Sequence, residues 1–552
     1  MRDDGGVNSR KARFVPVALP VLTALGVVTI LSGCATESEG TDGPTSGETG
    51  LVAQAAEPRE SALVLGSTDP AELALTASQA FFTSAPVVVL AVADDDAARA
   101  TAAAAAVELA APVLLVGGAI SDTGLRTEID RLGAVALVVV GEDDVPPGQD
   151  DVEETPERDA SLGPVDGVEE VLLDVDALDA TGALDPHDLD DVLAALPARG
   201  EADTLTEVLV LTEPGSLDEA GGTQSAAIAT ARAAGAVPLE VPQGDPRSSA
   251  DVVQAISSAK ALAVVGIGES FGTADELAWR LRAAETGTLL PGGSQLVLAE
   301  GSRYVVVGAD AVTTSLVAVG ENARSAAVEG ALDAAAGFAE AVPEETVVPV
   351  LEVPATRQSS TAGTDRDYST EIPAQELLPL VDEAAAAGVL VVLRLEPGRS
   401  TFAEQVEEYA EVLARPTVGV VLDVGARTPG DGARAGTVQA TELAAAIEAV
   451  GTVVREQELP QKLVVVQRPE ADAVRDPEEL DVGDGEVAVV LQSTSRAGYG
   501  ARVRDWTVLL EEAPDGVVGG WTTGSSDPTR DVEGVLSLDP SPRYVAASRQ
   551  GG

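Results

Sequence analysis

Short apolar runs alternate with longer Ala-rich stretches along most of the chain from residue 62 onward. The runs are rich in Val, Leu and Ile, whereas the stretches between them have the length and composition of helices. This alternation is typical of βα units that build a parallel sheet, so the sequence predicts an α/β protein. In residues 61–296 we expect strands at 62–65, 87–91, 113–116, 136–140, 208–211, 237–241 and 261–265, and helices at 70–82, 97–109, 121–132, 220–234, 250–258 and 275–284.

These elements predict Rossmann-like parallel βα repeats in two blocks, 61–150 and 151–296. A Pro-rich acidic stretch between residues 141 and 167 predicts a surface loop. Residues 266–272, which read Gly-Ile-Gly-Glu-Ser-Phe-Gly, lie between an expected strand and an expected helix. They superficially resemble a dinucleotide-binding loop, but the glycine spacing is not Gly-x-Gly-x-x-Gly and no acidic residue ends a second strand. The segment therefore predicts an ordinary tight turn, and we expect no cofactor.

The second half of the chain, residues 297–552, contains eight apolar runs that are separated mostly by helical segments. Eight strands alternating with helices over about 250 residues are typical of a (β/α)8 barrel. Residues 470–484, between the fifth and sixth runs, look irregular. The expected strands are 304–307, 347–353, 390–395, 418–422, 463–466, 487–491, 516–519 and 534–538, and the expected helices are 323–340, 374–387, 402–413, 440–456 and 502–512.

The N-terminus has the pattern of an export signal. Residues 14–31 carry no charge, and Arg10, Lys11 and Arg13 come directly before them. The segment Leu-Ser-Gly that precedes Cys34 resembles the lipobox of bacterial lipoproteins. The resemblance implies that residues 1–33 are a cleaved signal peptide and that Cys34 becomes a lipid-bearing first residue.

Two other interpretations of this segment stay open, an uncleaved transmembrane anchor and an ordinary secretory signal. Pro16 and Pro20 weaken the run as a permanent helix, and small residues before Cys34 favour cleavage. Residues 34–60 are rich in Gly, Ser, Thr and Glu and predict a disordered tether. We therefore expect a protein that is held by the lipid on the outer face of the cell membrane.

Composition excludes several classes of function. The formal net charge of −57 opposes binding to nucleic acid, since phosphates would be repelled. The chain has a single cysteine, so a lipidated Cys34 leaves no thiol for a disulfide, a metal or catalysis. The single histidine, His187, lies in an acidic segment where it predicts the start of a helix. A Ser-His-Asp or Cys-His site and a zinc site of the usual histidine type are therefore excluded. A site of oxygen ligands only, for Ca²⁺ or Mg²⁺, stays open, but no loop has a recognisable spacing for it, so we expect no metal.

One part of the first half resembles a known family. Residues 111–116 read Ala-Pro-Val-Leu-Leu-Val and are followed by an expected helix and a strand that ends in Gly141. This order is similar to the putative cell wall-binding repeat 2 family, whose closing strand ends in two glycines. The second glycine is Glu142 here. The resemblance implies binding to cell-wall polysaccharide or peptidoglycan.

The second half resembles a family of uncharacterised actinobacterial lipoproteins with a barrel domain, over roughly residues 286–545. The similarity rests on the segments 365–369, 397–400, 416–423 and 459–463. Family members tend to carry Leu-Asp-Pro-Glu-Trp-Arg after the fourth strand and His-Gln-Phe after the fifth. Here residues 422–427 read Leu-Asp-Val-Gly-Ala-Arg, and residues 467–469 read Gln-Arg-Pro. The Glu and the His of the family pattern are therefore missing.

Polar residues follow most of the expected barrel strands, and the carboxyl ends of barrel strands are where barrel enzymes place their chemistry. Glu396 and Asp423 follow consecutive strands and could form the carboxylate pair of a glycosidase, with Glu352 as a third candidate. Polar residues are also expected at any strand end of so acidic a protein. The expected rim consists of Asp310, Glu352, Glu396, Asp423, Gln467, Gln492 and Trp521.

The leading hypothesis from the sequence is a lipid-anchored envelope protein that binds or scaffolds cell-wall polymer and whose barrel has lost catalytic residues. A second hypothesis is an active carbohydrate hydrolase that uses Glu396 and Asp423. A third is a solute-binding lipoprotein, because two consecutive α/β blocks can enclose a ligand cleft.

Overall fold

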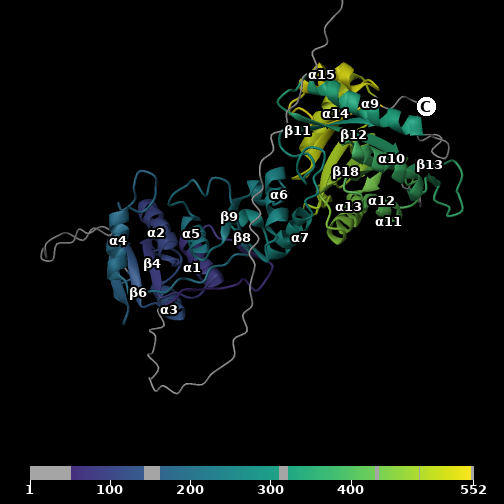
Figure 1. Ribbon diagram of the computed structural model, residues 1–552. Helices are drawn as coiled ribbons and strands as arrows, with labels where there is room; N and C mark the ends of the chain where they lie inside the picture. Colours follow the sequence, from purple (N-terminus) through teal and green to yellow (C-terminus); the bar gives the residue numbers. More distant parts are fainter. Residues whose placement is uncertain are drawn as a thin grey trace, which may run out of the picture. The chain divides into compact units, whose positions relative to one another are not determined.

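A computed structural model describes residues 51–141, 162–309, 321–428, 434–483, 485–495 and 497–548 (Figure 1). The described chain is a mixed α/β protein with parallel sheets in its first half and a closed barrel of parallel strands in its second half. The predicted fold class is confirmed. None of the described helices is both long enough and apolar enough to cross a membrane.

The first half contains two four-stranded parallel sheets, with strand orders β5-β4-β6-β7 and β2-β10-β8-β9, and a short antiparallel pair of β1 and β3. Its strands are β1 Gln54–Ala55, β2 Ala62–Leu65, β3 Phe82–Ser84, β4 Val87–Val92, β5 Val113–Val116, β6 Ala136–Gly141, β7 Glu169–Asp174, β8 Val208–Thr212, β9 Val237–Glu240 and β10 Ala263–Ile267. Its helices are α1 Pro70–Phe81, α2 Asp96–Leu109, α3 Asp122–Leu132, α4 Pro186–Ala195, α5 Ser225–Ala233, α6 Ala250–Ala259 and α7 Ala274–Glu285.

Each of the two sheets contains a strand from the other expected block, across the boundary at residue 150. Strand β2, from the first block, pairs with β10 in the second sheet, and β7, from the second block, pairs with β6 in the first sheet. Helix α5 packs against both α1 and α2. Its small side chains, among them the fully buried Ala226 and Ala227, allow this close approach.

The eight barrel strands close in the order β11-β12-β15-β16-β18-β20-β21-β22. The barrel strands are β11 Ser302–Gly308, β12 Thr346–Pro354, β15 Leu390–Leu395, β16 Val418–Asp423, β18 Lys462–Arg468, β20 Val487–Ser493, β21 Val518–Thr522 and β22 Tyr544–Ala546. Two short pairs are β13 Thr356–Gln358 with β14 Ser369–Glu371 and β17 Val438–Gln439 with β19 Val474–Arg475. The helices are α9 Glu321–Ala339, α10 Ala374–Ala386, α11 Phe402–Glu408, α12 Ala410–Leu413, α13 Ala440–Glu456, α14 Tyr499–Glu512 and α15 Val532–Leu536.

The prediction for the last barrel strand is wrong. Residues 532–536 form helix α15, and the strand that closes the barrel is β22, eight residues further along. Val535 is the one fully buried residue of α15. A short helix on the surface needs only one such inward side chain, whereas a central strand would bury a continuous run. Strand β22 pairs with both β11 and β21 and so completes the ring.

Alternate side chains of the barrel strands point inward and outward, as the strand period requires. The inward set forms one buried cluster that includes Tyr304, Val350, Val392, Val465 and Val490. The outward set packs against the surrounding helices in a second, larger cluster. The barrel interior is therefore filled with side chains.

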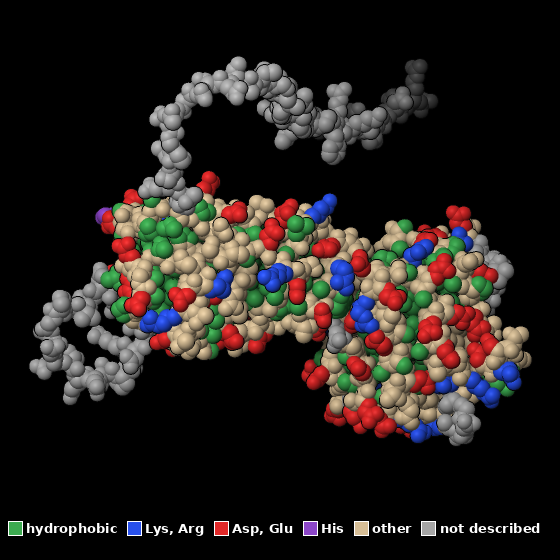
Figure 2. Space-filling view, turned by 90° about the horizontal axis from the view of Figure 1, so that it is seen from below, with side chains coloured by type: hydrophobic (Ala, Val, Ile, Leu, Met, Phe, Trp, Pro, Cys, Tyr) green, Lys and Arg blue, Asp and Glu red, His purple; other side chains and the backbone are tan. Residues whose placement is uncertain are grey.

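Acidic side chains are spread over the whole face of the molecule shown in Figure 2, with Lys and Arg in smaller numbers. On that face the acidic side chains are therefore not gathered into one patch.

Candidate functional site

A cavity of about 680 Å³ lies at the carboxyl ends of the barrel strands. Glu352 near the end of β12, Asp423 at the end of β16, and Gln467 and Gln492 in β18 and β20 all line it. Asp423, Gln467 and Gln492 stand at the same level because they are register partners in adjacent strands. Parallel pairing therefore brings these distant parts of the sequence to one site.

Glu352 is the centre of a buried polar network in this cavity. Arg394 Nη1 donates a hydrogen bond to Glu352 Oε1 at 2.7 Å, and Gln467 Nε2 donates to Glu352 Oε2 at 2.9 Å. Gln467 Nε2 also donates to Gln492 Oε1 at 3.0 Å, and Gln492 Nε2 donates to Thr522 Oγ1 at 2.9 Å. Glu352 is only 4% exposed, so these partners replace the water that the carboxylate loses on burial.

Glu396 occupies a different environment from Glu352 and Asp423. Its Oε1 accepts a hydrogen bond from Arg394 Nε at 3.0 Å, and its Oε2 accepts one from the backbone N–H of Gln358 at 2.9 Å. Glu396 is not among the described residues that line the cavity, whereas Glu352 and Asp423 both line it. Of the three predicted carboxylates, the cavity therefore brings together Glu352 and Asp423.

The remaining rim residues divide into two groups. Gln467 and Gln492 line the cavity as their positions after the strands suggested. Trp521 is buried, with 2% of its surface exposed, and packs edge-on against Tyr499 at a ring-centroid distance of 6.2 Å. Tyr499 is 45% exposed and lines the cavity, so it supplies the aromatic surface that Trp521 supports from behind. Asp310 lies outside the described residues.

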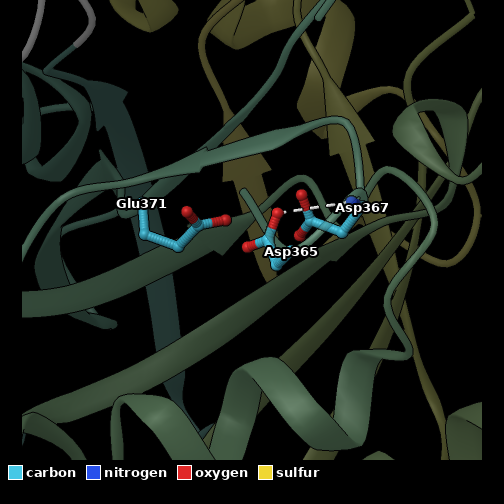
Figure 3. A group of neighbouring side chains, drawn as sticks. All are labelled: Asp365, Asp367 and Glu371. Carbon is cyan, nitrogen blue, oxygen red and sulfur yellow. Dashed lines mark hydrogen bonds between the residues drawn. The ribbon is translucent and has the colours of Figure 1, made fainter. Parts of the chain in front are cut away.

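A second group of acidic residues, which the sequence analysis did not single out, lies in the loop that joins β13 to β14 and at the end of β14. Oxygen atoms of Asp365, Asp367 and Glu371 lie within 4.8 Å of one another (Figure 3). Burial and then the charges of Glu371, Asp367 and Asp365 raise the pKa of the neighbouring Glu408. With one ligand atom from each residue, these carboxylates supply three of the six to eight oxygen ligands that Ca²⁺ takes. The spacing Asp-x-Asp-x-x-x-Glu was the only available signal in the sequence.

Lys462, at the start of β18, is a buried lysine at the opposite end of this strand from Gln467. Its Nζ donates hydrogen bonds to the carbonyl oxygens of Arg415 at 2.8 Å and Val418 at 2.9 Å. Burial lowers the pKa of Lys462 to about 7. Because it lies at the amino ends of the strands, Lys462 is a structural residue of the barrel and not part of the cavity.

His187 lies in the first turn of α4, where its backbone N–H donates to the Asp185 side chain at 2.8 Å. The prediction that this histidine starts a helix is confirmed. Cys34 lies outside the described residues, so its lipidation stays a prediction.

Comparison with known proteins leaves the family of this chain open. No family model matches the sequence, and no curated protein matches it. Among solved structures, the chain is similar to an archaeal fructose-1,6-bisphosphate aldolase whose catalytic lysine is bound to a carbinolamine intermediate. That match has 12% identity and a TM-score of 0.26, and it covers 45% of this chain and 96% of the aldolase chain.

The chain is also similar to Cwp6 from Clostridium difficile, again with 12% identity. This match has a TM-score of 0.27 and covers 60% of this chain and 63% of the Cwp6 chain. Similarity at this level carries no inference about ligand or activity. The resemblances of residues 111–141 and 286–545 to the two families stay predictions.

Proposed function

We propose that this protein is a lipid-anchored protein of the cell envelope that binds cell-wall polymer, and that the cavity of its barrel is a binding site and not a catalytic one. The anchor is Cys34, and the ligand is a polyhydroxylated segment of the polymer. Concave sites that combine an aromatic surface with a few fixed polar groups are typical of small-ligand binding.

The observation that carries the proposal is the engagement of Glu352 on both of its oxygens, by Arg394 and by Gln467. A general acid or a nucleophile needs a carboxylate that can reach the scissile bond and exchange a proton or form a bond there. Glu352 is instead held in a buried ion pair with Arg394 Nη1, and Glu396 pairs with Nε of the same arginine. These contacts favour a rigid polar wall that orients hydroxyl groups.

Sedimentation with purified cell walls tests this proposal on the full-length chain. We expect the protein to sediment with the walls and to be released by soluble wall polymer. Tyr499→Ala should weaken sedimentation several-fold, because it removes the exposed aromatic surface of the cavity. Leu332→Ala serves as the matched control, since Leu332 is an exposed apolar residue on α9, 37% exposed, that does not line the cavity. Sedimentation that is absent, or equal for both variants, would contradict the proposal.

The anchor is tested separately by replacing Cys34 with Ser and fractionating cells. The wild-type protein should be found in the membrane fraction, and Cys34→Ser should shift it to the soluble or secreted fraction because no thiol remains for lipid attachment. Retention of the variant in the membrane would favour an uncleaved transmembrane anchor instead.

One observation keeps hydrolysis as a second candidate function. Glu352 and Asp423 line the same cavity, which is the arrangement that a carboxylate pair needs. If the barrel is a hydrolase, Glu352→Gln and Asp423→Asn should each abolish the release of reducing ends from wall polymer. Glu396→Gln is the control, because this residue does not line the cavity. Equal release by all three variants would exclude the pair.

A further inference from the structure

The barrel cavity has a cationic side chain in its wall whose role the proposed function does not yet include. Arg502, near the start of α14, is the only Lys, Arg or His among the described residues that line this cavity. Helix α14 follows β20, and the arginine reaches across to β21, where its Nη1 donates a hydrogen bond to the carbonyl oxygen of Thr522 at 2.5 Å. The remaining N–H groups of this guanidinium decide which ligand the cavity accepts.

Aromatic rings hold the guanidinium of Arg502 in place. Its Cζ lies 5.1 Å from the ring centroid of Trp521 and 5.9 Å from that of Tyr499. Both distances are within the range of cation–π attraction. A Cβ at residue 524 would come within 3.1 Å of Arg502 Nη2, so Gly524 leaves space beside this nitrogen. The rings and the bond to Thr522 therefore fix the side chain before a ligand arrives.

None of the described carboxylates forms an ion pair with Arg502. The chain has 91 Asp and Glu against 34 Lys and Arg, so acidic partners for an arginine are abundant. Its Nε and Nη2 have no hydrogen-bond partner among the described residues, and neither atom is among the buried ones that lack a partner. Both nitrogens are therefore accessible donors with a positive charge, and such donors bind anionic oxygen atoms most strongly.

The two carboxylates among the described lining residues, Glu352 and Asp423, lie away from Arg502. In the closed order of the barrel, two strands separate β21, which Arg502 contacts, from β12 on one side and from β16 on the other. The charge of Glu352 is compensated by Arg394. The cavity therefore has acceptors for hydroxyl groups on one wall and a cation on the opposite wall.

Two serine hydroxyls in the same cavity add uncharged donors. Ser495 and Ser548 line it, and neither hydroxyl donates a hydrogen bond to a described residue. Ser495 Oγ accepts one from the backbone N–H of Ala497 at 3.4 Å, which leaves its own O–H for a ligand. Hydroxyl and guanidinium donors together suit a group that has several acceptor oxygens.

We propose that the ligand of the barrel cavity is an acidic saccharide, whose anionic group binds Arg502 while its hydroxyl groups face Asp423. This inference rests on the proposed function, since it names the chemical class of the polymer segment that the cavity binds. A carboxylate and a phosphate offer the same chemistry to a guanidinium, namely paired oxygen acceptors with a negative charge. A neutral saccharide leaves the charge of Arg502 unpaired and therefore binds more weakly.

Competition for the full-length chain bound to purified cell walls tests the proposal. The probes are sodium glucuronate, glucose 6-phosphate and glucose, with NaCl added so that the ionic strength is equal. We expect at least one acidic sugar to release the protein at a concentration about tenfold lower than glucose does. The more effective acid shows whether the bound group is a carboxylate or a phosphate. Release by neither acid, or release by glucose at the same concentration, would overturn the proposal.

The same experiment separates this inference from the proposed function. A chain that does not sediment with untreated walls overturns both. Sedimentation that depends on Tyr499 but is reversed equally by glucose and by the acids leaves polymer binding intact and overturns only the acidic ligand. General electrostatics predicts no preference for acids, because a chain with a net charge of −57 repels them.

Variants of two arginines on α14 assign the preference to one residue. Arg502→Gln keeps an N–H donor for Thr522 but removes the charge, so it should abolish the preference for an acid over glucose. Arg502→Lys keeps the charge and should retain part of the preference. Arg504→Gln removes the same charge from an exposed position outside the cavity and should behave as the wild type.

Thermal unfolding shows whether each variant is folded, and the competition result for the wild-type chain stands on its own if one is not. A preference for acids that persists in folded Arg502→Gln, or that Arg504→Gln loses to the same extent, would overturn the assignment to Arg502.

Discussion

Lys462 shows how one residue in an otherwise apolar environment can be accommodated by the barrel. Its side chain is almost completely buried, and its Nζ donates hydrogen bonds to backbone carbonyl groups near the start of β16. Its pKa is lowered to about 7 by burial alone, because the charged form is disfavoured away from water. The protonation state of this single group therefore couples the stability of the barrel to pH.

The sign of this coupling follows from the lowered pKa. Between pH 7 and about 10 the unfolded chain holds the lysine proton and the folded chain does not. The folded chain is therefore more stable at high pH, and the part of its stability that depends on Lys462 is lost as the pH falls toward 7. We expect the free energy of unfolding to rise by up to about 1.4 kcal/mol per pH unit over this range through Lys462.

Urea denaturation measures the pH dependence of the unfolding free energy. Hydrogen exchange of the backbone amides in β18 reports it locally. Lys462→Met should remove the contribution of Lys462 to the slope of the unfolding free energy against pH. Lys260→Met removes a lysine from an exposed position and should leave the slope as in the wild type. The same slope in all three proteins would show that Lys462 keeps its proton on folding.

Arg394 is the second residue whose replacement has a clear expected outcome. It is 3% exposed and pairs with Glu352 and Glu396 at the same time. Arg394→Met leaves one carboxylate buried without its cation, so we expect the free energy of unfolding to fall by about 3–5 kcal/mol.

A surface ion pair provides the comparison for Arg394. The side chains of Arg415 and Asp382 are 42% and 58% exposed, and their Nε and Oδ1 atoms are 3.0 Å apart. Arg415→Met should therefore cost at most about 1 kcal/mol. In the double variant Glu352→Gln with Arg394→Met, part of the lost stability should return, since the uncompensated charge is gone. Similar losses for Arg394→Met and Arg415→Met in thermal unfolding would argue against a buried ion pair.

At the scale of single elements, helix α11 begins with a capping box. Thr401 Oγ1 accepts a hydrogen bond from the backbone N–H of Glu404 at 3.2 Å, and Glu404 Oε2 accepts one from the backbone N–H of Thr401 at 2.7 Å. Thr401→Ala should lower the stability by about 1 kcal/mol, because a donor at the helix start loses its partner. Denaturant unfolding measures the change.

Thr507→Ala is the control for the capping residue, since Thr507 is exposed within α14. Alanine has a higher helix propensity than threonine, so this variant should be neutral or slightly stabilising. A loss of equal size in both variants would show that the threonine side chain, and not the cap, is responsible.

The sequence predicts buried elements well and peripheral ones poorly. Strands β2 and β5 and helix α13 have the expected bounds, because continuous apolar runs and regular Ala spacing mark them. Strand β7 was not expected. It reads Glu-Glu-Val-Leu-Leu-Asp and lies at the edge of its sheet, where only Val171 and Leu173 are buried. Strand β22 is only three residues long, so its pairing on both sides and not its composition defines it.

The candidate sites depend on contacts that periodicity does not encode. The positions of Glu352, Asp423, Gln467 and Gln492 near the carboxyl ends of barrel strands were predictable, because parallel strands end at a common edge. The choice of partners was not, since Gln467 reaches Glu352 across 115 residues of sequence. Nor could the sequence indicate that Glu396 would pair with Arg394 and would not line the cavity.

At the scale of the whole molecule, the net charge of −57 affects stability as well as binding partners. Repulsion among carboxylates is strongest in the compact state, so folding works against it. The Debye length falls from about 10 Å at 0.1 M salt to about 3 Å at 1 M, which screens exposed charges but leaves buried pairs largely unaffected. We expect the melting temperature to rise by several degrees as salt is raised over this range.

Sodium chloride and choline chloride at equal ionic strength distinguish screening from specific cation binding. An equal rise of the melting temperature with both salts is the expected result, because general screening does not depend on the identity of the cation. The stabilisation should level off once exposed charges are screened, while the loss caused by Arg394→Met should persist at every salt concentration because that pair is buried. A melting temperature that falls with salt, or rises with sodium alone, would show that surface repulsion is not what limits the stability of this acidic chain.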